Sequence, residues 1–309
     1  NYKQKSPIPM YQRVIVLIGL FLTVGLGVSS IEISAKIEKP TQQNSSLWQI
    51  QKNGELEGYL VGSIHVMKQE VYPLTPVFRE GFTEADLVVF ETNLDEVRSQ
   101  SVSLIEMGMY QDGTTLQQTL PPETYNKVET LASSLGIPMS ALNQMEPWLA
   151  SQLITMQLLQ QAGYSPLYGI DLYFYKQAQQ EDKPYMGLET PREQFQFFDE
   201  LPTKTQIAFL THSIEQTQAK IQEVDEIVAI WKQGDMTGLE EMLLDPMEED
   251  FPEIYQALIV ERNQTWMPEI IELLREDEVP FIVVGTAHLV GDRGLIKQIQ
   301  AKGYTLKQL

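Results

Sequence analysis

The sequence predicts an α/β fold, in which a central mixed sheet is built from two related strand-GxxH halves with a large helical insertion between them. Two observations predict this fold. Strand-like runs occur near both ends of the chain, and mainly helical patterns separate them. In addition, the runs "GYLVGSIHV" (58–66) and "FIVVGTAHLVG" (281–291) both continue an apolar stretch into Gly-x-x-His. We therefore expect strands from opposite ends of the chain to meet in one sheet.

Residues 1–35 have the layout of a signal peptide or an N-terminal membrane anchor. Basic residues precede the apolar stretch 14–28, small and polar residues follow it, and Ala35 is a candidate cleavage position. The stretch is short against the roughly 20 residues of a spanning helix. Export to the periplasm or the exterior is therefore favoured, and membrane tethering through residues 14–28 is the alternative. Residues 36–46 are predicted to be a linker, and residues 47–309 the folded domain.

The composition excludes several classes of function. The chain of 309 residues has 42 acidic and 22 basic residues, which gives a formal net charge of −20. Such a surface repels phosphate backbones, so no nucleic-acid partner is expected. The chain has no cysteine, which excludes disulfides, cysteine-ligated zinc and a cysteine nucleophile.

The first predicted elements are a hairpin, a helix and a buried strand. Two β-rich runs flank Asn53-Gly54, which is a strong turn signal, and the second run ends at His65. Thr75-Pro76 opens a short helix. The buried strand 86–92 then ends on Glu91. From about 95 to 182 the pattern is mainly helical, with helix starts at prolines.

The second half begins with a short strand, 183–190, which ends on Glu189. One long helix is predicted from about 203 to 233, because apolar residues recur there at heptad-like spacing. His212 falls beside this stripe, and we expect it to be a solvated side chain without a function. The helical block, about 95–275, ends before the apolar strand 279–288. A helix at 293–302 and the terminal strand "YTLKQ" complete the chain.

Four side chains able to do chemistry stand at predicted strand ends, where loops converge and open α/β sheets bind ligands. A glycine three residues before each histidine allows a tight turn or a close backbone approach. We therefore expect the four side chains to share one cavity: His65, Glu91, Glu189 and His288.

Two imidazoles and a carboxylate are a common ligand set for a divalent metal that keeps one position for water. Such an ion lowers the pKa of bound water to about 7 and polarises a carbonyl, so hydrolysis is the natural reaction class. The chain has no G-x-S-x-G, H-E-x-x-H, Walker or dinucleotide-binding pattern. The alternative is structural: a histidine at a strand end often bonds a loop carbonyl, and the two glutamates are then helix caps or solvated ends.

Arg262 and Asp171 are further candidates. Arg262 follows Leu258 and Ile259 by four and three residues, on their helical face. It is predicted either to enter a pocket and hold a carboxylate or oxyanion, or to extend its charged end into water. Asp171 is either an acid at a helix start or a partner that orients a histidine.

The chain resembles the TraB/GumN (PrgY, Tiki-like) family, which is related more distantly to erythromycin esterases and ChaN-type proteins. The motifs that carry the resemblance span nearly all of residues 47–309 in the family's order: "VGSIH", "VVFETN", "YGIDLYF", "GLET", "ERN" and "VVGTAHLVG". The resemblance implies two related halves whose Gly-x-x-His loops face one cleft. It also implies catalytic roles for His65, Glu91, Arg262 and His288.

The Tiki-like branch of that family consists of manganese- or cobalt-dependent proteases, and a plasmid-borne branch is associated with shutting down peptide pheromones. The esterase relatives are thought to activate water without an established metal. By resemblance we therefore expect a metal-dependent, peptidase-like hydrolase that acts on a peptide or small-molecule substrate.

In this hypothesis His65, His288 and Glu91 bind Mn, Co or Zn or activate water directly. Arg262 stabilises the oxyanion, and Glu189 orients a ligand or moves a proton. The alternatives are a protein that binds or sequesters a peptide or small ligand without turnover, a metal-free esterase-like hydrolase, and a scaffold that uses the 203–233 helix as its contact surface.

Overall fold

The structure is a computed structural model that describes residues 45–215 and 217–309. The predicted export segment 1–35, its apolar stretch 14–28 and nearly all of the linker lie outside these residues. Within the described part of the chain, no helix is both long and apolar enough to cross a membrane.

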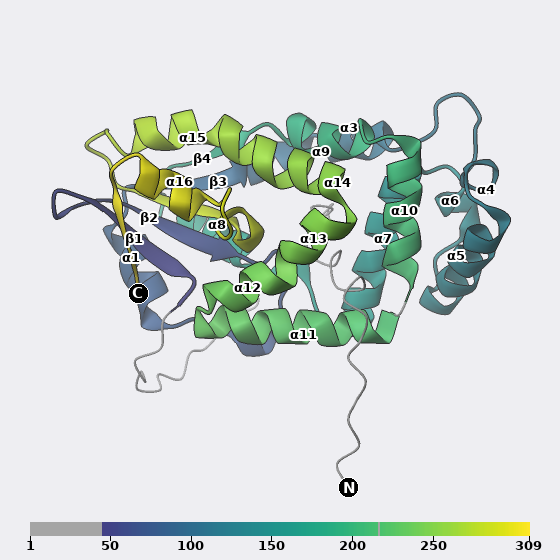
Figure 1. The fold of residues 1–309 in the computed structure, drawn as a ribbon, viewed down its shortest axis with the longest axis horizontal. Helices are drawn as coiled ribbons and strands as arrows, with labels where there is room; N and C mark the ends of the chain where they lie inside the picture. Colours follow the sequence, from purple (N-terminus) through teal and green to yellow (C-terminus); the bar gives the residue numbers. More distant parts are fainter. Residues whose placement is uncertain (1–44, 216) are drawn as a thin grey trace, which may run out of the picture.

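A six-stranded mixed sheet forms the centre of the molecule, which confirms the predicted fold class (Figure 1). The four strands β4, β3, β5 and β2 are parallel, and β1 is antiparallel to both of its neighbours, β2 and β6. Asn53 and Gly54 have positive φ at the predicted hairpin turn. In chain order the strands are β1 (Leu47–Lys52), β2 (Glu55–Ser63), β3 (Leu87–Thr92), β4 (Tyr185–Glu189), β5 (Pro280–Gly285) and β6 (Thr305–Gln308).

The two Gly-x-x-His segments leave the sheet side by side. Strands β2 and β5 are parallel neighbours, and Ser63 pairs with Gly285 at their carboxyl ends. Thr286 donates from Oγ1 to the Ser63 carbonyl at 3.0 Å. A Cβ on Gly62 would stand 2.8 Å from that Oγ1, so only glycine permits this approach. The prediction that opposite ends of the chain meet in one sheet is confirmed.

Helices cover both faces of the sheet and extend beyond it. Helices α4, α5 and α6 lie at the end of the molecule farthest from the sheet (Figure 1), where a second hydrophobic cluster joins them to α7 and α10. The helices up to β4 are α1 (Pro76–Glu84), α2 (Leu94–Ser99), α3 (Ser101–Met107), α4 (Leu116–Thr119), α5 (Pro122–Leu135), α6 (Met139–Leu142), α7 (Pro147–Gln161) and α8 (Ile170–Gln180). Those that follow are α9 (Pro191–Asp199), α10 (Thr203–Ile214), α11 (Thr217–Gln233), α12 (Met236–Leu243), α13 (Asp245–Asp250), α14 (Pro252–Tyr255), α15 (Arg262–Leu273) and α16 (Leu295–Ala301).

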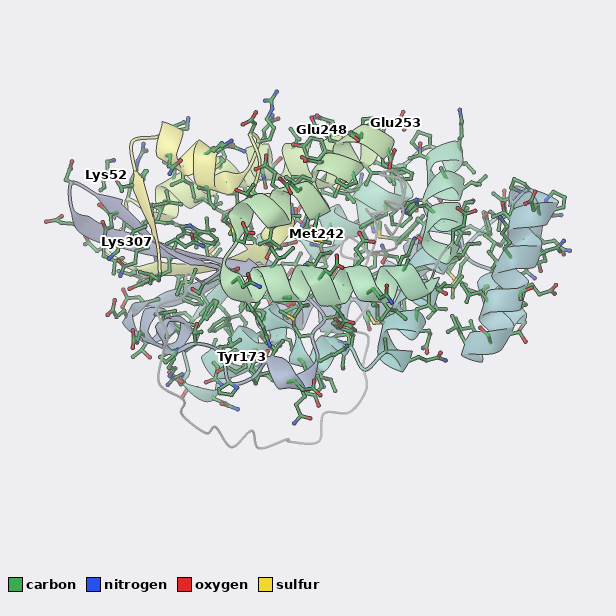
Figure 2. The ribbon with its side chains drawn as sticks, turned by 60° about the horizontal axis from the view of Figure 1, so that its bottom comes forward. Lys52, Tyr173, Met242, Glu248, Glu253 and Lys307 are labelled. Carbon is green, nitrogen blue, oxygen red and sulfur yellow. The ribbon has the colours of Figure 1, made fainter. Side chains whose placement is uncertain are left out.

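The negative charge is displayed on exposed helices. Glu248 on α13 and Glu253 on α14 point outward from the surface (Figure 2).

The prediction of one helix from about 203 to 233 is wrong, because the chain turns at Glu215 and forms α10 and α11 instead. Glu215 has extended backbone angles, with φ −83° and ψ 143°. The apolar stripe also serves different packing surfaces. Leu210 belongs to the distal cluster with α7, whereas Trp231 belongs to the main core and donates from Nε1 to the Gly62 carbonyl. The spacing of apolar residues alone does not show whether they belong to one long helix or to two helices with different packing surfaces.

The prediction of a solvated His212 is also wrong. Its ring lies 5.5 Å from the Phe251 ring, and its Nε2 is enclosed without a hydrogen-bond partner among the described residues. Burial, with a smaller contribution from Lys220, lowers the pKa of His212 to about 4. The segment around α14 covers this face of α10, which the sequence of α10 cannot reveal.

Candidate functional site

The four residues predicted at strand ends meet in one buried site at the carboxyl edge of the sheet. Glu91 is the next-to-last residue of β3 and Glu189 the last of β4. His65 follows β2 by two residues, and His288 ends the 3₁₀ turn Thr286–His288 after β5. Nε2 of each histidine lies 3.9 Å from the same atom, Glu91 Oε1. Two imidazoles from the two halves of the chain thus face one carboxylate oxygen.

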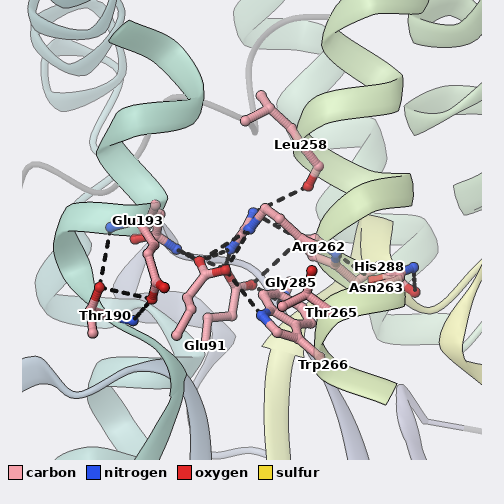
Figure 3. Close-up of polar contacts among 12 residues, drawn as sticks. Glu91, Thr190, Glu193, Leu258, Arg262, Asn263, Thr265, Trp266, Gly285 and His288 are labelled. Atoms are coloured by element: carbon pink, nitrogen blue, oxygen red, sulfur yellow. Dashed lines mark hydrogen bonds and ion pairs between the residues drawn. The ribbon is translucent and has the colours of Figure 1, made fainter. Parts of the chain in front are cut away.

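Glu91 is held as a carboxylate by donors on both of its oxygens. The Gly285 amide donates to Oε1 at 2.6 Å, and Arg262 Nη2 donates to Oε2 at 2.5 Å (Figure 3). Burial disfavours the charge, but Arg262 and the two histidines outweigh it and hold the pKa of Glu91 at about 2. A Cβ on Gly285 would stand 3.0 Å from Glu91 Oε1 and 3.4 Å from His65 Nε2. A larger residue at this position would therefore press against both side chains.

Arg262 is buried, with only 3% of its surface exposed. Its guanidinium reaches both glutamates, so the structure does not place its charge in water. Nε and Nη2 donate to Glu189, at 3.1 and 2.7 Å, and Nη2 also donates to Glu91. Nη1 donates to the Leu258 carbonyl at 3.3 Å and lies 3.1 Å from His288 Nε2. All five N–H groups thus have acceptors within the protein. The predicted oxyanion role stays a prediction, and it requires one of these bonds to change partner.

The backbone that carries Arg262 is irregular. Residues Gln256–Glu261 form a π-helix immediately before α15, so the ordinary helical spacing used to place Arg262 does not apply there. Such wide turns are rare and often lie at functional sites. Leu258, Ile259 and Arg262 nevertheless all face inward.

Glu189 accepts only N–H donors. Besides Arg262, the Trp266 indole donates to Oε2 at 3.0 Å and Gln194 Nε2 donates to Oε1 at 3.1 Å. Burial raises the pKa of Glu189 above its usual value, and Arg262 opposes that rise. The pKa values of the two carboxyl groups are therefore shifted in opposite directions, a pattern typical of acid–base pairs.

Asn263 fixes the tautomer of His288. Its Nδ2 donates to the carbonyls of His288 and Arg293, each at 3.0 Å, so its Oδ1 must be the atom that faces His288 Nδ1 at 2.7 Å. An amide oxygen only accepts, hence Nδ1 carries the proton and Nε2 carries the lone pair. Burial and then Arg262 lower the pKa of His288 to about 3, so the ring is neutral. The lone pair of Nε2 accepts the Arg262 hydrogen bond.

His65 has a charged partner instead. Its Nδ1 lies 3.3 Å from Asp171 Oδ1, which also accepts from Ser63 Oγ at 3.2 Å. Burial lowers the pKa of His65, but Asp171 and then Glu91 outweigh it, and the pKa is raised overall. Asp171 lies in the first turn of α8, as predicted for an acid at a helix start, and its predicted role in orienting a histidine stays a prediction.

Three residues of this network carried no predicted role. Asn263 follows Arg262 directly, and Trp266 lies four residues beyond it, which places both on the helix that carries the arginine. The Trp266 ring also lies 4.5 Å from the His288 ring. Gln194 donates to both glutamates from α9. The sequence around Gln194 does not indicate a role in the site, because its contact with the two glutamates depends on how α9 packs.

Two imidazoles and a carboxylate are side chains of the kinds that bind divalent ions. Two atoms that share one ion lie at most about 4.2 Å apart, since each bond is about 2.1 Å, and both histidine–Glu91 distances are 3.9 Å. His288 Nδ1 donates to Asn263 Oδ1, and His65 Nδ1 lies 3.3 Å from Asp171 Oδ1. Metal-binding histidines normally have an oxygen at this position. In the described part of the chain, however, no three His, Asp or Glu side chains are already spaced as a ligand group. The lone pair of His288 Nε2 that an ion would need is, in addition, taken by the hydrogen bond from Arg262.

The fold and the site define an α/β protein with paired Gly-x-x-His loops. The model of the TraB/PrgY/gumN family matches residues 46–308, and the chain belongs to this family. It is similar to the "Uncharacterized protein YbaP" of Shigella flexneri and to that of Escherichia coli (strain K12). Each is 20% identical over 247 residues, which cover 80% of this chain and 89% of the relative. No solved structure matches the chain.

Proposed function

We propose that this protein is a metal-dependent, peptidase-like hydrolase in which His65, His288 and Glu91 hold Mn, Co or Zn. One observation carries the proposal: the Nε2 atoms of both histidines lie 3.9 Å from a single oxygen of an ionised carboxylate. A bound ion would supply a water of lowered pKa and would polarise the scissile carbonyl. Peptides are the proposed substrates, small molecules the alternative, and export would place the enzyme outside the cytoplasm.

The protein's own residues prepare this site. Asn263 keeps the proton of His288 on Nδ1 and so leaves a lone pair on Nε2, and Asp171 lies 3.3 Å from Nδ1 of the other histidine. Arg262 and Gln194 each donate to both glutamates, so they fix the distance between the two carboxyl groups. Glu189 has the raised pKa of the pair and is the group proposed to hold a proton for the leaving amine. For that step one of its N–H donors must change partner.

A metal-free hydrolase or a ligand-binding protein is the second candidate. The observation that favours it is the bond between Arg262 Nη1 and His288 Nε2 at 3.1 Å. With this bond in place, the guanidinium already provides the cation that neutralises the carboxylates.

The test uses the full chain and three single variants. Metal content is measured by elemental analysis and turnover on a peptide library, for the native protein and for His65→Ala and His288→Ala. His212→Ala is the matched control, because His212 is the third histidine and lies outside the site. The proposal expects one equivalent of ion and multiple turnovers, both lost in the two site variants and kept in the control. Turnover without an ion would support the metal-free candidate, and ligand uptake without turnover would support binding.

A further inference from the structure

The lone pair of His288 Nε2 has two possible partners. In the structure it accepts from Arg262 Nη1, because Asn263 forces the proton onto Nδ1. One lone pair binds either an N–H group or a metal ion, never both. Arg262 and an ion that includes His288 among its ligands therefore exclude each other at this atom.

From this we infer that Arg262 is a built-in counter-cation, which competes with a divalent ion for His288 and so sets the metal affinity of the site. The inference rests on the proposed function and assigns Arg262 a role toward the same ion. The free energy of metal binding at the native site is then less favourable than that of its ligands alone, and the difference is the free energy needed to detach Nη1 from His288.

Charge supports the competition. The guanidinium donates to both glutamates and is the permanent cation of a cluster in which Glu91 is ionised. A second cation next to Glu91 meets repulsion from Arg262 at short range, in a buried setting where screening by water is weak. Removal of the arginine charge lowers this repulsion and frees Nε2 in a single step.

The helix that carries Arg262 is irregular on both sides of the residue. A π-helix, Gln256–Glu261, lies on one side, and Pro268 interrupts α15 on the other. Proline has no N–H for the carbonyl four residues earlier, so this stretch lacks part of the usual helical bonding. The three guanidinium nitrogens lie in one rigid plane. The bond between Nη1 and His288 Nε2 therefore opens when the His288 ring or the whole guanidinium moves.

The first experiment measures zinc and manganese affinity by titration calorimetry on the full chain, its ions removed beforehand. Arg262→Gln is compared with the native protein and with Arg192→Gln, the same change at an exposed position of α9. We expect Arg262→Gln to bind at least tenfold more tightly and Arg192→Gln to match the native protein. Equal or weaker binding by a folded Arg262→Gln overturns the inference, and so does a lack of binding by all three proteins.

A second measurement covers the case in which Arg262→Gln does not fold. The chain has three histidines, so the ring nitrogens of the native protein can be followed by ¹⁵N NMR during zinc addition, with His212 as the internal reference. We expect the His288 Nε2 resonance to move to a metal-bound position while the Arg262 Nη1 protons lose their hydrogen-bonded shift, with the same midpoint. Zinc uptake that leaves the His288 Nε2 resonance unchanged overturns the inference.

Peptide hydrolysis on the same samples separates the two ideas. If the native protein hydrolyses peptides only with an ion, and Arg262→Gln has native affinity, the inference fails and the proposed function stands. If no hydrolysis occurs at saturating ion, the proposed function fails, and the affinity ratio still decides the inference.

Discussion

The two Gly-x-x-His segments have the same backbone setting and opposite electrostatics. Both follow parallel strands that are direct neighbours, and both histidines face Glu91 Oε1 at 3.9 Å. Yet burial and Arg262 lower the pKa of His288 to about 3, whereas Asp171 and Glu91 outweigh burial and raise that of His65.

The two pKa values differ because the ring nitrogens of His65 and His288 have different partners. His288 has a neutral amide at Nδ1 and a guanidinium at Nε2, and its side chain is 4% exposed. His65 has a carboxylate at Nδ1, and its side chain is 10% exposed. The repeated motif therefore determines where an imidazole stands, and residues from distant helices determine its charge. Asp171 from α8 and Arg262 from α15 make the two halves unequal.

The largest effect is expected from removing the negative charge of Glu91, which the two halves share. Glu91→Gln deprives Arg262 and the Gly285 amide of a buried anionic acceptor, and loss of one partner of a buried ion pair costs about 3–5 kcal/mol. We expect that decrease in the free energy of unfolding in urea. Glu96→Gln, an exposed change on α2, is the control and should stay within about 0.5 kcal/mol of the native protein. A small loss at Glu91 would mean that Glu189 alone compensates Arg262.

The contributions of His288 and His65 to stability should change with pH in opposite directions. His288 is neutral in the folded state down to a pKa of about 3, whereas the unfolded chain takes up a proton near pH 6.5. The unfolded state thus binds more protons, and stability falls by about 1.4 kcal/mol per pH unit between roughly pH 6 and 4. His65, with its raised pKa, stabilises the fold below about pH 6.5 and loses this contribution as pH rises through the folded pKa.

Urea unfolding of His288→Asn and His65→Asn over pH 4 to 8 measures both contributions. In a plot of the free energy of unfolding against pH, His288→Asn should reduce the slope between about pH 4 and 6. His65→Asn should reduce the slope above about pH 6.5. His212 contributes with the same sign as His288, so each variant is compared with the native slope rather than with zero. If both variants reduce the slope in the same pH range, the assigned charge difference is wrong.

Asn263→Ala tests the His288 half alone. It removes the acceptor of Nδ1 and the donor to the buried His288 carbonyl, and an unsatisfied buried group costs about 1–3 kcal/mol. The Arg293 carbonyl keeps its second donor, Gln298 Nε2. We expect a loss of about 2 kcal/mol and, by ¹⁵N NMR, appearance of the Nε2–H tautomer of His288. Gln264→Ala, exposed on the same helix, should change neither quantity. A His288 tautomer that does not change would show that Arg262 fixes it without Asn263.

Much of the frame of this site was predictable because its signals are local. The Asn53-Gly54 turn, the glycine before each histidine and the acids at strand ends all act within a few residues of the side chain they place. The convergence at one edge then follows from the rule for parallel strands.

The rest depends on contacts that no local pattern encodes. The turn at Glu215 separates α10 and α11, which pack into different clusters, and the sequence pattern did not indicate the π-helix before Arg262. Gln194 joins the site only because α9 lies against both glutamates. The opposite pKa shifts of the histidines need Asp171 and Arg262 in place, so a repeated motif wrongly suggests equal halves.

The smallest effect on stability, and the most specific test of the asymmetry, is expected from Asp171→Asn. The amide keeps an oxygen for Ser63 and for His65 Nδ1 but removes the charge that opposes burial of the imidazolium. The pKa of His65 should fall, because burial, which disfavours the charged ring, is then opposed by Glu91 alone. The loss of stability at pH 6 should be about 1 kcal/mol or less, since the aspartate is 21% exposed on its side chain. NMR titration of the three histidines reads both rings at once: a fall at His65 with His288 unmoved supports separate control of the halves, whereas a joint shift would mean that Glu91 couples them into one titrating unit.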